Sequence, residues 1–205
     1  FRIFCELLAK MMLETIDFIT QTLLEQKGKL DRFDPPVVYE STRWQQWVTQ
    51  PSPGTCPYCM LQDGRIYSRA EQPSIPPPVH PNCKCRLTPL REIPAGMATD
   101  QGLMGADFWL KMSRTLPEYY ISEEEIRALG WQRGKSPARY APGKMLTKGE
   151  YENRNGHLPQ RDGRVWYEAD LNYHEGKRNR HRIVWSNDGL IFVTYDHYAT
   201  FYAIE

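Results

Sequence analysis

Apolar side chains recur at steps of three and four residues along the first part of the chain. This spacing predicts an amphipathic helix over residues 1–27, which ends before Gly28. A stripe this apolar is typical of a packing face, so no separate function is assigned to it. Cys5 falls within the helix and is expected to be a small buried apolar residue.

In the last quarter of the chain the pattern changes to a period of two. Trp166, Glu168 and Asp170 are expected on one face of a strand, and Tyr167 and Ala169 on the other. Turn signals separate this strand from two further alternating segments, residues 180–186 and 190–204. The pattern predicts an antiparallel meander.

Two short helices are expected between these regions, near residues 107–114 and 122–130. Ser122 and Glu125 form a capping box at the start of the second helix. Helices followed by antiparallel strands predict an α+β fold for residues 107–205. Glycines in residues 96–106 predict a flexible linker, and residues 1–95 form a separate region that carries the N-terminal helix and a segment rich in proline and cysteine.

Composition narrows the functional classes. The 205 residues are 40% hydrophobic, which is enough to bury a core, and the net charge is +1. The even balance excludes a protein that binds nucleic acid through a global basic field, so any site for a polyanion must be local. No apolar run reaches the roughly 18 residues of a membrane span. The chain opens on Phe1 without a basic start, and we expect it to be part of something longer.

Four of the five cysteines lie in a segment that holds most of the prolines. The spacing C-x2-C…H-x2-C-x-C is typical of a structural zinc site, and it offers five candidate ligands for four positions. These candidates are Cys56, Cys59, His80, Cys83 and Cys85, of which either His80 or Cys85 is expected to be left out. A pair of disulfides and a loop of reduced cysteines remain alternatives. Catalytic zinc is disfavoured because no acidic residue stands beside these ligands to act as a base.

The same segment resembles a known family. The run Cys56-Pro-Tyr-Cys59, Asp63-Gly64 and His80-Pro-Asn-Cys83-Lys-Cys85-Arg86-Leu87 is similar to the C-terminal end of phage minor head (Mu F-like) morphogenesis proteins. The resemblance implies a portal-associated virion protein with phage portal or head proteins as partners. Toxin domains are sometimes fused to proteins of this family.

Charged residues on the C-terminal strands are compatible with catalysis. Glu168 and Asp170 share a face, and two carboxylates repel unless cations lie nearby; Arg178 and Arg182 on the next strand are suitable partners. With His197 they supply a base, an acid and guanidinium groups, which metal-free RNA cleavage requires. The alternative is that the charges form a solvated sheet face and that the histidine is structural.

A series of short sequence motifs, in order across the last hundred residues, resembles the barnase-like family of bacterial guanyl-preferring ribonucleases. They include Ala128-Leu129-Gly130-Trp131, Ala141-Pro142-Gly143-Lys144, Gly163-Arg164-Val165-Trp166, Glu168-Ala169-Asp170 and Asp196-His197-Tyr198. The resemblance implies helices packed on a five-stranded antiparallel sheet. It also implies an endoribonuclease that cleaves RNA by transesterification to a 2′,3′-cyclic phosphate without a metal cofactor.

The resemblance assigns roles to individual residues. Glu168 becomes the general base, His197 the general acid, and Arg178 and Arg182 the phosphate ligands, while Asp170 holds the arginines. Substrate binding is assigned to Tyr151, Glu152, Asn153, Arg154, Asn155 and Tyr198. A structural ion pair is expected between Arg164 and Asp188. Glu168 beside arginines is expected to stay ionised, and His197 beside Asp196 to retain a proton, which predicts a bell-shaped pH profile.

Two positions depart from the family pattern. Glu123 stands where the family has a lysine that contacts the scissile phosphate, which predicts a slower enzyme unless Lys144, Lys148 or Lys177 compensates. Asn155 stands where the family has a glutamate that accepts two guanine N–H groups, which puts the base preference in doubt.

The sequence therefore favours an endoribonuclease toxin or effector domain on a phage-head-type protein. Its expected partners are RNA and an acidic, barstar-like immunity protein. It is expected to be secreted or virion-associated and to act in the cytoplasm of a target cell. The alternatives are a structural virion protein with a catalytically impaired RNA-binding domain, and a zinc-stabilised RNA-binding module without turnover.

Overall fold

The computed structural model describes residues 33–205. The chain divides into two units, Phe1–Asp34 and Pro35–Glu205, and the description below concerns the second. The helix predicted over residues 1–27, including Cys5, lies outside the described residues. None of the helices in residues 33–205 is long and apolar enough to cross a membrane.

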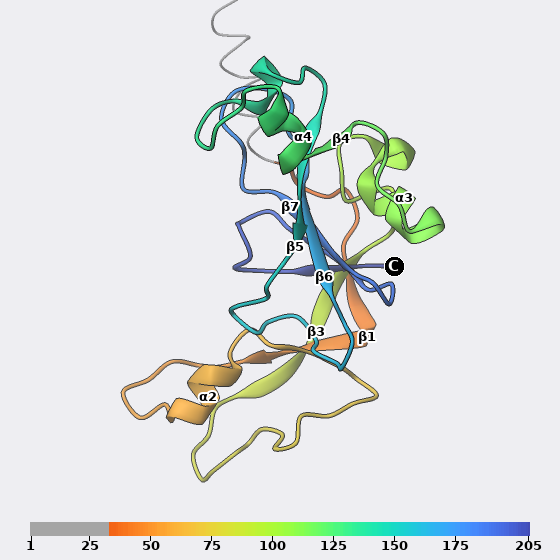
Figure 1. Ribbon diagram of the computed structural model, residues 1–205. Coiled ribbons are helices and arrows are strands. Elements are labelled where there is room, and N and C mark those ends of the chain that lie inside the picture. The colour runs from red at the N-terminus through yellow and green to blue at the C-terminus, as the bar shows by residue number, and fades with distance from the viewer. Residues whose placement is uncertain (1–32) are drawn as a thin grey trace, which may run out of the picture. The chain divides into compact units, whose positions relative to one another are not determined.

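A single mixed sheet of nine strands runs through the unit, with the order β2-β1-β3-β9-β8-β7-β6-β5-β4 (Figure 1). Neighbouring strands are antiparallel except for the parallel pairs β3–β9 and β4–β5. The strands are β1 (Tyr39–Val48), β2 (Ile66–Ser68), β3 (Arg86–Ile93), β4 (Tyr120–Ser122), β5 (Met145–Glu150), β6 (Trp166–Asp170), β7 (Arg182–Ser186), β8 (Ile191–Thr194) and β9 (Tyr202–Ile204).

The helices are few and short, as expected for this α+β fold. They are α2 (Pro57–Gln62), α3 (Ala106–Ser113) and α4 (Glu123–Ala128), with 3-10 turns at Gly102–Met104 and Pro137–Arg139. The capping box predicted at Ser122 is confirmed: its hydroxyl accepts from the Glu125 N–H, and the Glu125 carboxylate accepts from the Ser122 N–H. This reciprocal pair starts α4 where the sequence predicts it.

The alternation predicted for β6 is confirmed by the two apolar clusters on opposite faces of the sheet. Ala169 packs with Leu110 of α3 on one face. Trp166 packs on the other with Phe192, and this second cluster also contains Trp44, Ile66 and Leu90 from the first three strands. A third cluster around Ile126 seats α4 beside β4 and β5. The face that carries Trp166 also carries Glu168 and Asp170.

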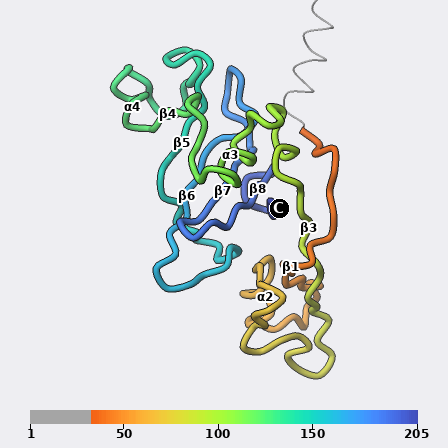
Figure 2. The backbone as a smooth tube through the Cα atoms, turned by 90° about the vertical axis from the view of Figure 1, so that its right-hand side faces the viewer, coloured from red at the N-terminus to blue at the C-terminus, as the bar shows by residue number. Residues whose placement is uncertain are grey.

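The five-stranded antiparallel sheet expected from the resemblance is present as β9-β8-β7-β6-β5, and the proline-rich region adds further strands to the same sheet. β3 pairs with β9 through Glu92 opposite Ala203 and Ile93 opposite Ile204. Figure 2 shows β1 and β3 beside the later strands and α2 at the end remote from α4. Proline argued against strands here, but its positions leave β1 intact and place Pro89 alone within β3.

The segment predicted as a linker, residues 96–106, is bonded to the start of α3. The fully buried carboxylate of Asp107 accepts hydrogen bonds from the N–H groups of Gly96 and Ala98 at 2.7 and 3.0 Å and from the Thr99 hydroxyl at 3.3 Å. The glycines of this segment allow a tight turn around that carboxylate rather than free motion. The division of the chain into regions 1–95 and 107–205 stays a prediction.

The strand predicted over residues 190–204 is wrong in its middle. A loop separates β8 from β9, and His197 and Tyr198 in it have φ values of 64° and 70°. The Asp196 carboxylate holds this loop by accepting from the N–H groups of Ala199 and Thr200 and from the Thr194 and Thr200 hydroxyls. A short acidic side chain that bonds to the backbone just beyond it favours a turn over a strand.

Candidate active site

Glu168 lies in the middle of β6, opposite Val184 of β7, and is 7% exposed. Its carboxylate forms an ion pair with the Lys148 ammonium at 3.1 Å and accepts a hydrogen bond from the Tyr198 hydroxyl. Lys148 and Tyr198 therefore hold the Glu168 carboxylate in place. The side chain faces solvent through the cleft described below.

A β-bulge in β5 brings Lys148 to this carboxylate. The register of β5 against β6 shifts between Thr147 and Gly149, and Gly149 has φ 76°. Because a bulge inserts a residue and turns the neighbouring side chain, Lys148 reaches Glu168. Gly149 supplies the positive φ that a β-branched residue would resist.

Asp170 holds both arginines, whereas the sequence pattern had shared them between Asp170 and Glu168. The fully buried Asp170 carboxylate accepts two bonds from Arg178, at 2.7 and 2.5 Å, and lies 3.2 Å from Nε of Arg182. Glu168 instead forms its ion pair with Lys148. This arrangement leaves Asp170 as the anchor of the guanidinium pair and Glu168 free of it.

The two arginines differ in exposure. Arg182 is 4% exposed, and its Nη1 donates to the backbone carbonyls of Asn179 and His181 at 2.8 and 2.5 Å. Arg178 is partly exposed and lines a cavity together with Lys148 and Arg133. Arg178 is thus positioned to meet an anion directly, while Arg182 contributes its charge from beneath the cleft.

His197 stands in the loop after β8, with its ring 4.7 Å from the ring of Tyr198. Burial of the ring, followed by the nearby cations Arg182 and Lys148, lowers the pKa of His197 below its usual range. The expectation that Asp196 helps this histidine to keep its proton is wrong, because the Asp196 carboxylate is engaged by Thr194, Ala199 and Thr200.

An open cleft of about 690 Å³ brings these groups together. Glu168, His197 and Tyr198 line it, with Lys148 and the loop of residues 151–155 along its sides. A carboxylate and an imidazole on one cleft, with Arg178 on the neighbouring cavity, can transfer protons on either side of a bound phosphodiester.

Five of the six predicted substrate-binding residues lie on this loop, and the sixth, Tyr198, lies in the loop after β8. Tyr151 stacks on Tyr198 with ring centroids 5.0 Å apart. Asn153 has φ 45° and is buried, and its side chain closes the loop by bonding to both the N–H and the carbonyl of Leu158. The Asn153 side chain is therefore occupied in shaping the loop.

The other members of the loop are exposed. Glu152 and Arg154 form an ion pair with each other. The Asn155 amide nitrogen lies 3.0 Å from Nδ1 of His157 and 3.4 Å from the carbonyl of Tyr198. Asn155 therefore sits at the mouth of the cleft with its amide directed toward the residues that border it.

Glu123 also lines the cleft, where it is paired with two arginines. Arg127 donates to its carboxylate at 3.0 and 2.5 Å, and Arg133 at 3.1 Å. Hydrogen bonds from Arg127 lower the pKa of Glu123, with Arg133 adding to the effect against the opposing effect of burial. A negative charge therefore persists at this wall of the cleft.

Sequence reasoning named Lys148 only as one of three possible compensators, and it missed Arg133. The signal for Lys148 was its place before a glycine inside a strand, which is typical of a bulge. Lys144, another of the three, donates instead to the carbonyl of Glu118 at 2.6 Å. Lys177 lines the neighbouring cavity that contains Arg178.

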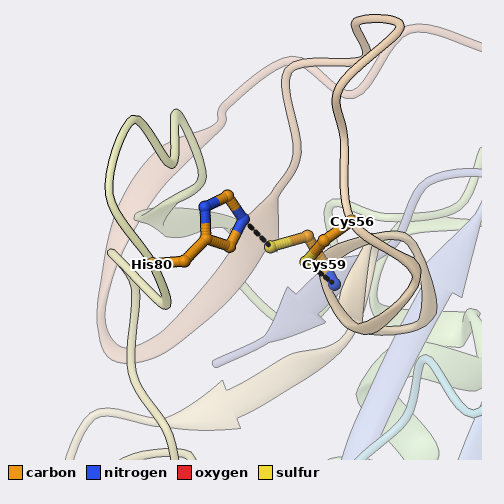
Figure 3. Close-up of side chains that lie close together, drawn as sticks. All are labelled: Cys56, Cys59 and His80. Carbon is orange, nitrogen blue, oxygen red and sulfur yellow. Dashed lines mark hydrogen bonds between the residues drawn. The ribbon is translucent and has the colours of Figure 1, made fainter.

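The five predicted metal ligands come together in two overlapping groups around Cys59. One contains Cys56, Cys59 and His80, and the other contains Cys59, Cys83 and Cys85; within each group the ligand atoms lie within 4.8 Å of one another. Figure 3 shows the His80 ring turned toward the Cys59 sulfur. The four cysteines among the described residues are unbridged.

Comparisons with known proteins concern the C-terminal half. Residues 110–205 match a family model described as ribonuclease. The ribonuclease of Heyndrickxia coagulans is 47% identical over 101 residues, which are 49% of this chain and 92% of that protein. The ribonucleases of Bacillus intermedius and Bacillus pumilus are each 46% identical over 101 residues, which are 49% of this chain and 62% of each relative. The matched region contains the whole cleft.

Proposed function

Because this chain belongs to the ribonuclease family through its C-terminal half and is an endoribonuclease, we propose that it cleaves single-stranded RNA by metal-free transesterification through a 2′,3′-cyclic phosphate. The observation that carries the proposal is the placement of Glu168 and His197 on one cleft, above two arginines that share the buried carboxylate of Asp170.

In the first step Glu168 removes the proton of the ribose 2′-hydroxyl. The 2′-oxygen attacks the adjacent phosphorus, the bond from phosphorus to the 5′-oxygen breaks, and His197 donates a proton to that leaving oxygen. In the second step the roles reverse, and water opens the cyclic phosphate. General acid–base catalysis of this kind contributes about 10²- to 10⁴-fold for each group.

Charge on phosphorus is balanced by Arg178 and Arg182, and Lys148 adds a third cation beside the base. The Lys148 ammonium lies 3.1 Å from Glu168, so it stands close enough to the reacting phosphate to offset part of its charge. We infer that Lys148 takes over part of the work of the lysine that Glu123 replaces.

The stacked pair Tyr151 and Tyr198 offers a flat surface for the base, and the loop of residues 151–155 borders it. Asn155 has one amide oxygen where two guanine N–H groups are best met by a carboxylate. We therefore propose a weaker preference for guanine than the family resemblance implies.

The test is cleavage of a single-stranded oligoribonucleotide by the full chain with a chelator present. Expected results are cleavage in excess chelator, a cyclic-phosphate end on the product by mass spectrometry, and loss of at least a hundredfold in rate for Glu168→Ala and His197→Ala. Glu175→Ala and His174→Ala change the same residue types outside the cleft and should cleave normally.

Other outcomes would replace the proposal. Tight binding without product would indicate an RNA-binding module, and no interaction with RNA would indicate a structural protein. Cleavage that survives both cleft substitutions would remove Glu168 and His197 from the mechanism.

The resemblance of residues 56–87 to phage minor head proteins favours a toxin or effector role. We propose a chain that is secreted or virion-associated and whose ribonuclease acts in the cytoplasm of a target cell, held inactive in its producer by an acidic, barstar-like protein. Expression in bacteria should arrest growth, and a co-expressed barstar-like protein should relieve the arrest. Normal growth with active enzyme present would contradict the toxin role.

A further inference from the structure

The segment that precedes β3 has no regular secondary structure to hold it in a fixed conformation. Between β2 and β3 the chain runs through residues 69–85 without a helix or strand, and five of these residues are prolines. Prolines donate no backbone hydrogen bonds, so a segment of this kind needs another source of order. The ligand groups of Cys56, Cys59, His80 and Cys83 meet at this segment.

The spacing of these groups fits a tetrahedral metal ion. The Cys59 sulfur lies 3.7 Å from the Cys83 sulfur and 3.9 Å from Nε2 of His80. With zinc–sulfur and zinc–nitrogen bonds of about 2.3 and 2.0 Å, a tetrahedron has edges of about 3.8 Å between two sulfurs and about 3.6 Å between sulfur and nitrogen. A disulfide needs about 2.05 Å, far less than the observed separation.

His80 is oriented as a metal ligand. Its Nδ1 lies 2.9 Å from the backbone carbonyl of Pro81, so the Nδ1–H tautomer donates there and leaves the lone pair of Nε2 directed at the sulfurs. Metal-binding histidines are commonly fixed through this second nitrogen by a backbone carbonyl. The orientation is independent of the sulfur spacing and points to the same occupant.

Cys56 and Cys59 are placed by the start of α2. Cys56 is the residue before the helix, Pro57 is its first residue, and the Cys56 sulfur accepts from the Cys59 N–H at 3.4 Å. Cys59 is 1% exposed and belongs to both ligand groups. The helix thus presents two sulfurs to the loop that carries His80 and Cys83.

Cys85 has a different neighbour. It is the last residue before β3, its sulfur lies 3.7 Å from the Thr49 hydroxyl, and it belongs only to the ligand group that lacks His80. We propose that one zinc ion is bound by Cys56, Cys59, His80 and Cys83, and that Cys85 stays outside the coordination sphere. The two ligand groups meet at Cys59, and the ion joins them by drawing the His80–Cys83 turn onto the start of α2.

Such a site is structural. Four protein ligands leave no position for a reactive water, and the nearest acidic side chain along α2, Asp63, accepts the Thr49 N–H at 2.8 Å. The inference goes beyond the proposed function, because RNA cleavage is expected to need no metal. The zinc proposal and the proposed ribonuclease function can therefore be disproved separately.

The test begins with metal analysis of the full chain purified without chelator. We expect about one zinc per chain, and cobalt substitution should give the intense visible absorption of a tetrahedral thiolate site. A strong chelator should remove the metal and lower the temperature of unfolding. Absence of zinc after folding in a zinc-containing medium, or a mass four hydrogens lighter that indicates two disulfides, would overturn the proposal.

Matched variants decide the ligand set. Cys83→Ser and His80→Ala should lose the metal, and Cys85→Ser should keep it. Loss in Cys85→Ser with retention in His80→Ala would overturn the assignment of His80. Ribonuclease activity reports whether each variant has folded, and cobalt titration of the metal-free wild-type chain tests the site without any substitution.

Discussion

Glu168 and Asp170 are two residues apart on one strand and face the same way, but their surroundings separate their chemistry. Asp170 is fully buried and pairs with both Arg178 and Arg182, so removing its charge would leave two guanidinium groups without their shared partner. Glu168 touches one ammonium and one hydroxyl and lines an open cleft, where it is within reach of a substrate.

Asp170→Asn tests this division. The substitution keeps the shape of the side chain and removes its charge, so Arg178 and Arg182 lose their shared partner. We expect destabilisation of about 3–5 kcal/mol and a loss of activity at least as large as that of Arg178→Ala. Chemical denaturation and steady-state cleavage measure the two effects. Asp162→Asn, an exposed aspartate in a loop, is the control and should change neither.

The lowered pKa of His197 sets the alkaline limit of the reaction. A general acid must be protonated, so a lower pKa means that activity falls at a lower pH as the pH rises. Burial and the cations Arg182, Lys148 and Arg180 cause the shift. We expect the alkaline limb of kcat/KM at or below the usual histidine value of about 6.5.

Arg180→Gln should move that limb upward, because it removes one of these cations from an exposed position. The shift should be a few tenths of a pH unit, and larger at low salt because the charge is screened by solvent. Arg161→Gln removes an exposed arginine elsewhere and should leave the profile unchanged. A downward shift in Arg180→Gln would mean that the limb belongs to another group.

Glu123 is the residue whose replacement is expected to speed the enzyme. Glu123→Lys removes a carboxylate from the wall of the cleft, frees Arg133 and adds a cation. A charged hydrogen bond to the transition state of about 1.5 kcal/mol or more corresponds to about tenfold or more in rate. Glu124→Lys, on the exposed side of the same helix, controls for net charge and should have little effect. An equal gain in cleavage rate in both variants would show that the added positive charge acts only by attracting RNA to the protein.

At the scale of elements, β2 supports the loop that borders the cleft. The Ile66 N–H donates to the carbonyl of His157 at 2.7 Å, and Ile66 packs with Leu158 in one apolar cluster. Gly64, just before β2, has φ 79°, and a Cβ there would lie 2.7 Å from Nε2 of His157. The proline- and cysteine-rich region therefore fixes the far end of the loop that starts at Tyr151.

Gly64→Ala should disturb this support. The added methyl group and the strained φ displace His157 and with it Asn155, so KM should rise several-fold while kcat changes little. Gly54→Ala is the control, because a Cβ at Gly54 meets nothing within 4 Å and its φ is not positive. Steady-state kinetics on a short oligoribonucleotide separates the two constants. A fall in kcat alone would show that the displacement reaches Glu168 or His197 instead.

Local patterns predicted the elements whose information is local. The alternation in β6 and the capping box at Ser122 are both present. The ion pair between Arg164 and Asp188, which the resemblance implied, is also present at 2.7 Å. The resemblance named the residues that line the cleft, and their catalytic roles stay predictions. No local pattern could reveal that Asp170 takes both arginines, because that depends on side-chain directions across two strands.

Features that depend on contacts between distant residues could not be predicted from local patterns either. The turn at His197 depends on several hydrogen bonds to one carboxylate, and the position of Lys148 depends on a register shift against β6. The strands β1 and β3 were hidden by the prolines around them. The pairing of β3 with β9 joins residues more than a hundred positions apart, which periodicity does not report.

At the scale of the whole unit, the ribonuclease region and the strands before it share one sheet and one apolar cluster. Leu90 of β3 is buried in the cluster that contains Phe192 and Phe201. Damage to the first region should therefore weaken the second, and the unit should lose its structure in one cooperative transition.

Leu90→Ala measures this coupling. We expect a loss of about 2–5 kcal/mol in stability and a matching fall in the temperature at which RNA cleavage is lost. Leu61→Ala, an exposed leucine of the same region, should change neither quantity. The regions would be energetically independent if the Leu90→Ala variant unfolded in two separate transitions and lost its activity only in the transition that the substitution does not shift.

The place of β9 has a consequence during synthesis. This strand is made after all the others described, yet it lies between β3 and β8, and Ala203 and Ile204 are buried on opposite faces of the sheet. While residues 202–204 are still inside the ribosome, the sheet has a gap at its centre and the neighbouring loop that holds His197 is unsupported on one side. A nascent chain therefore cannot complete its cleft until residues 202–204 have left the ribosome, and the cell has until then to prepare to bind or export it.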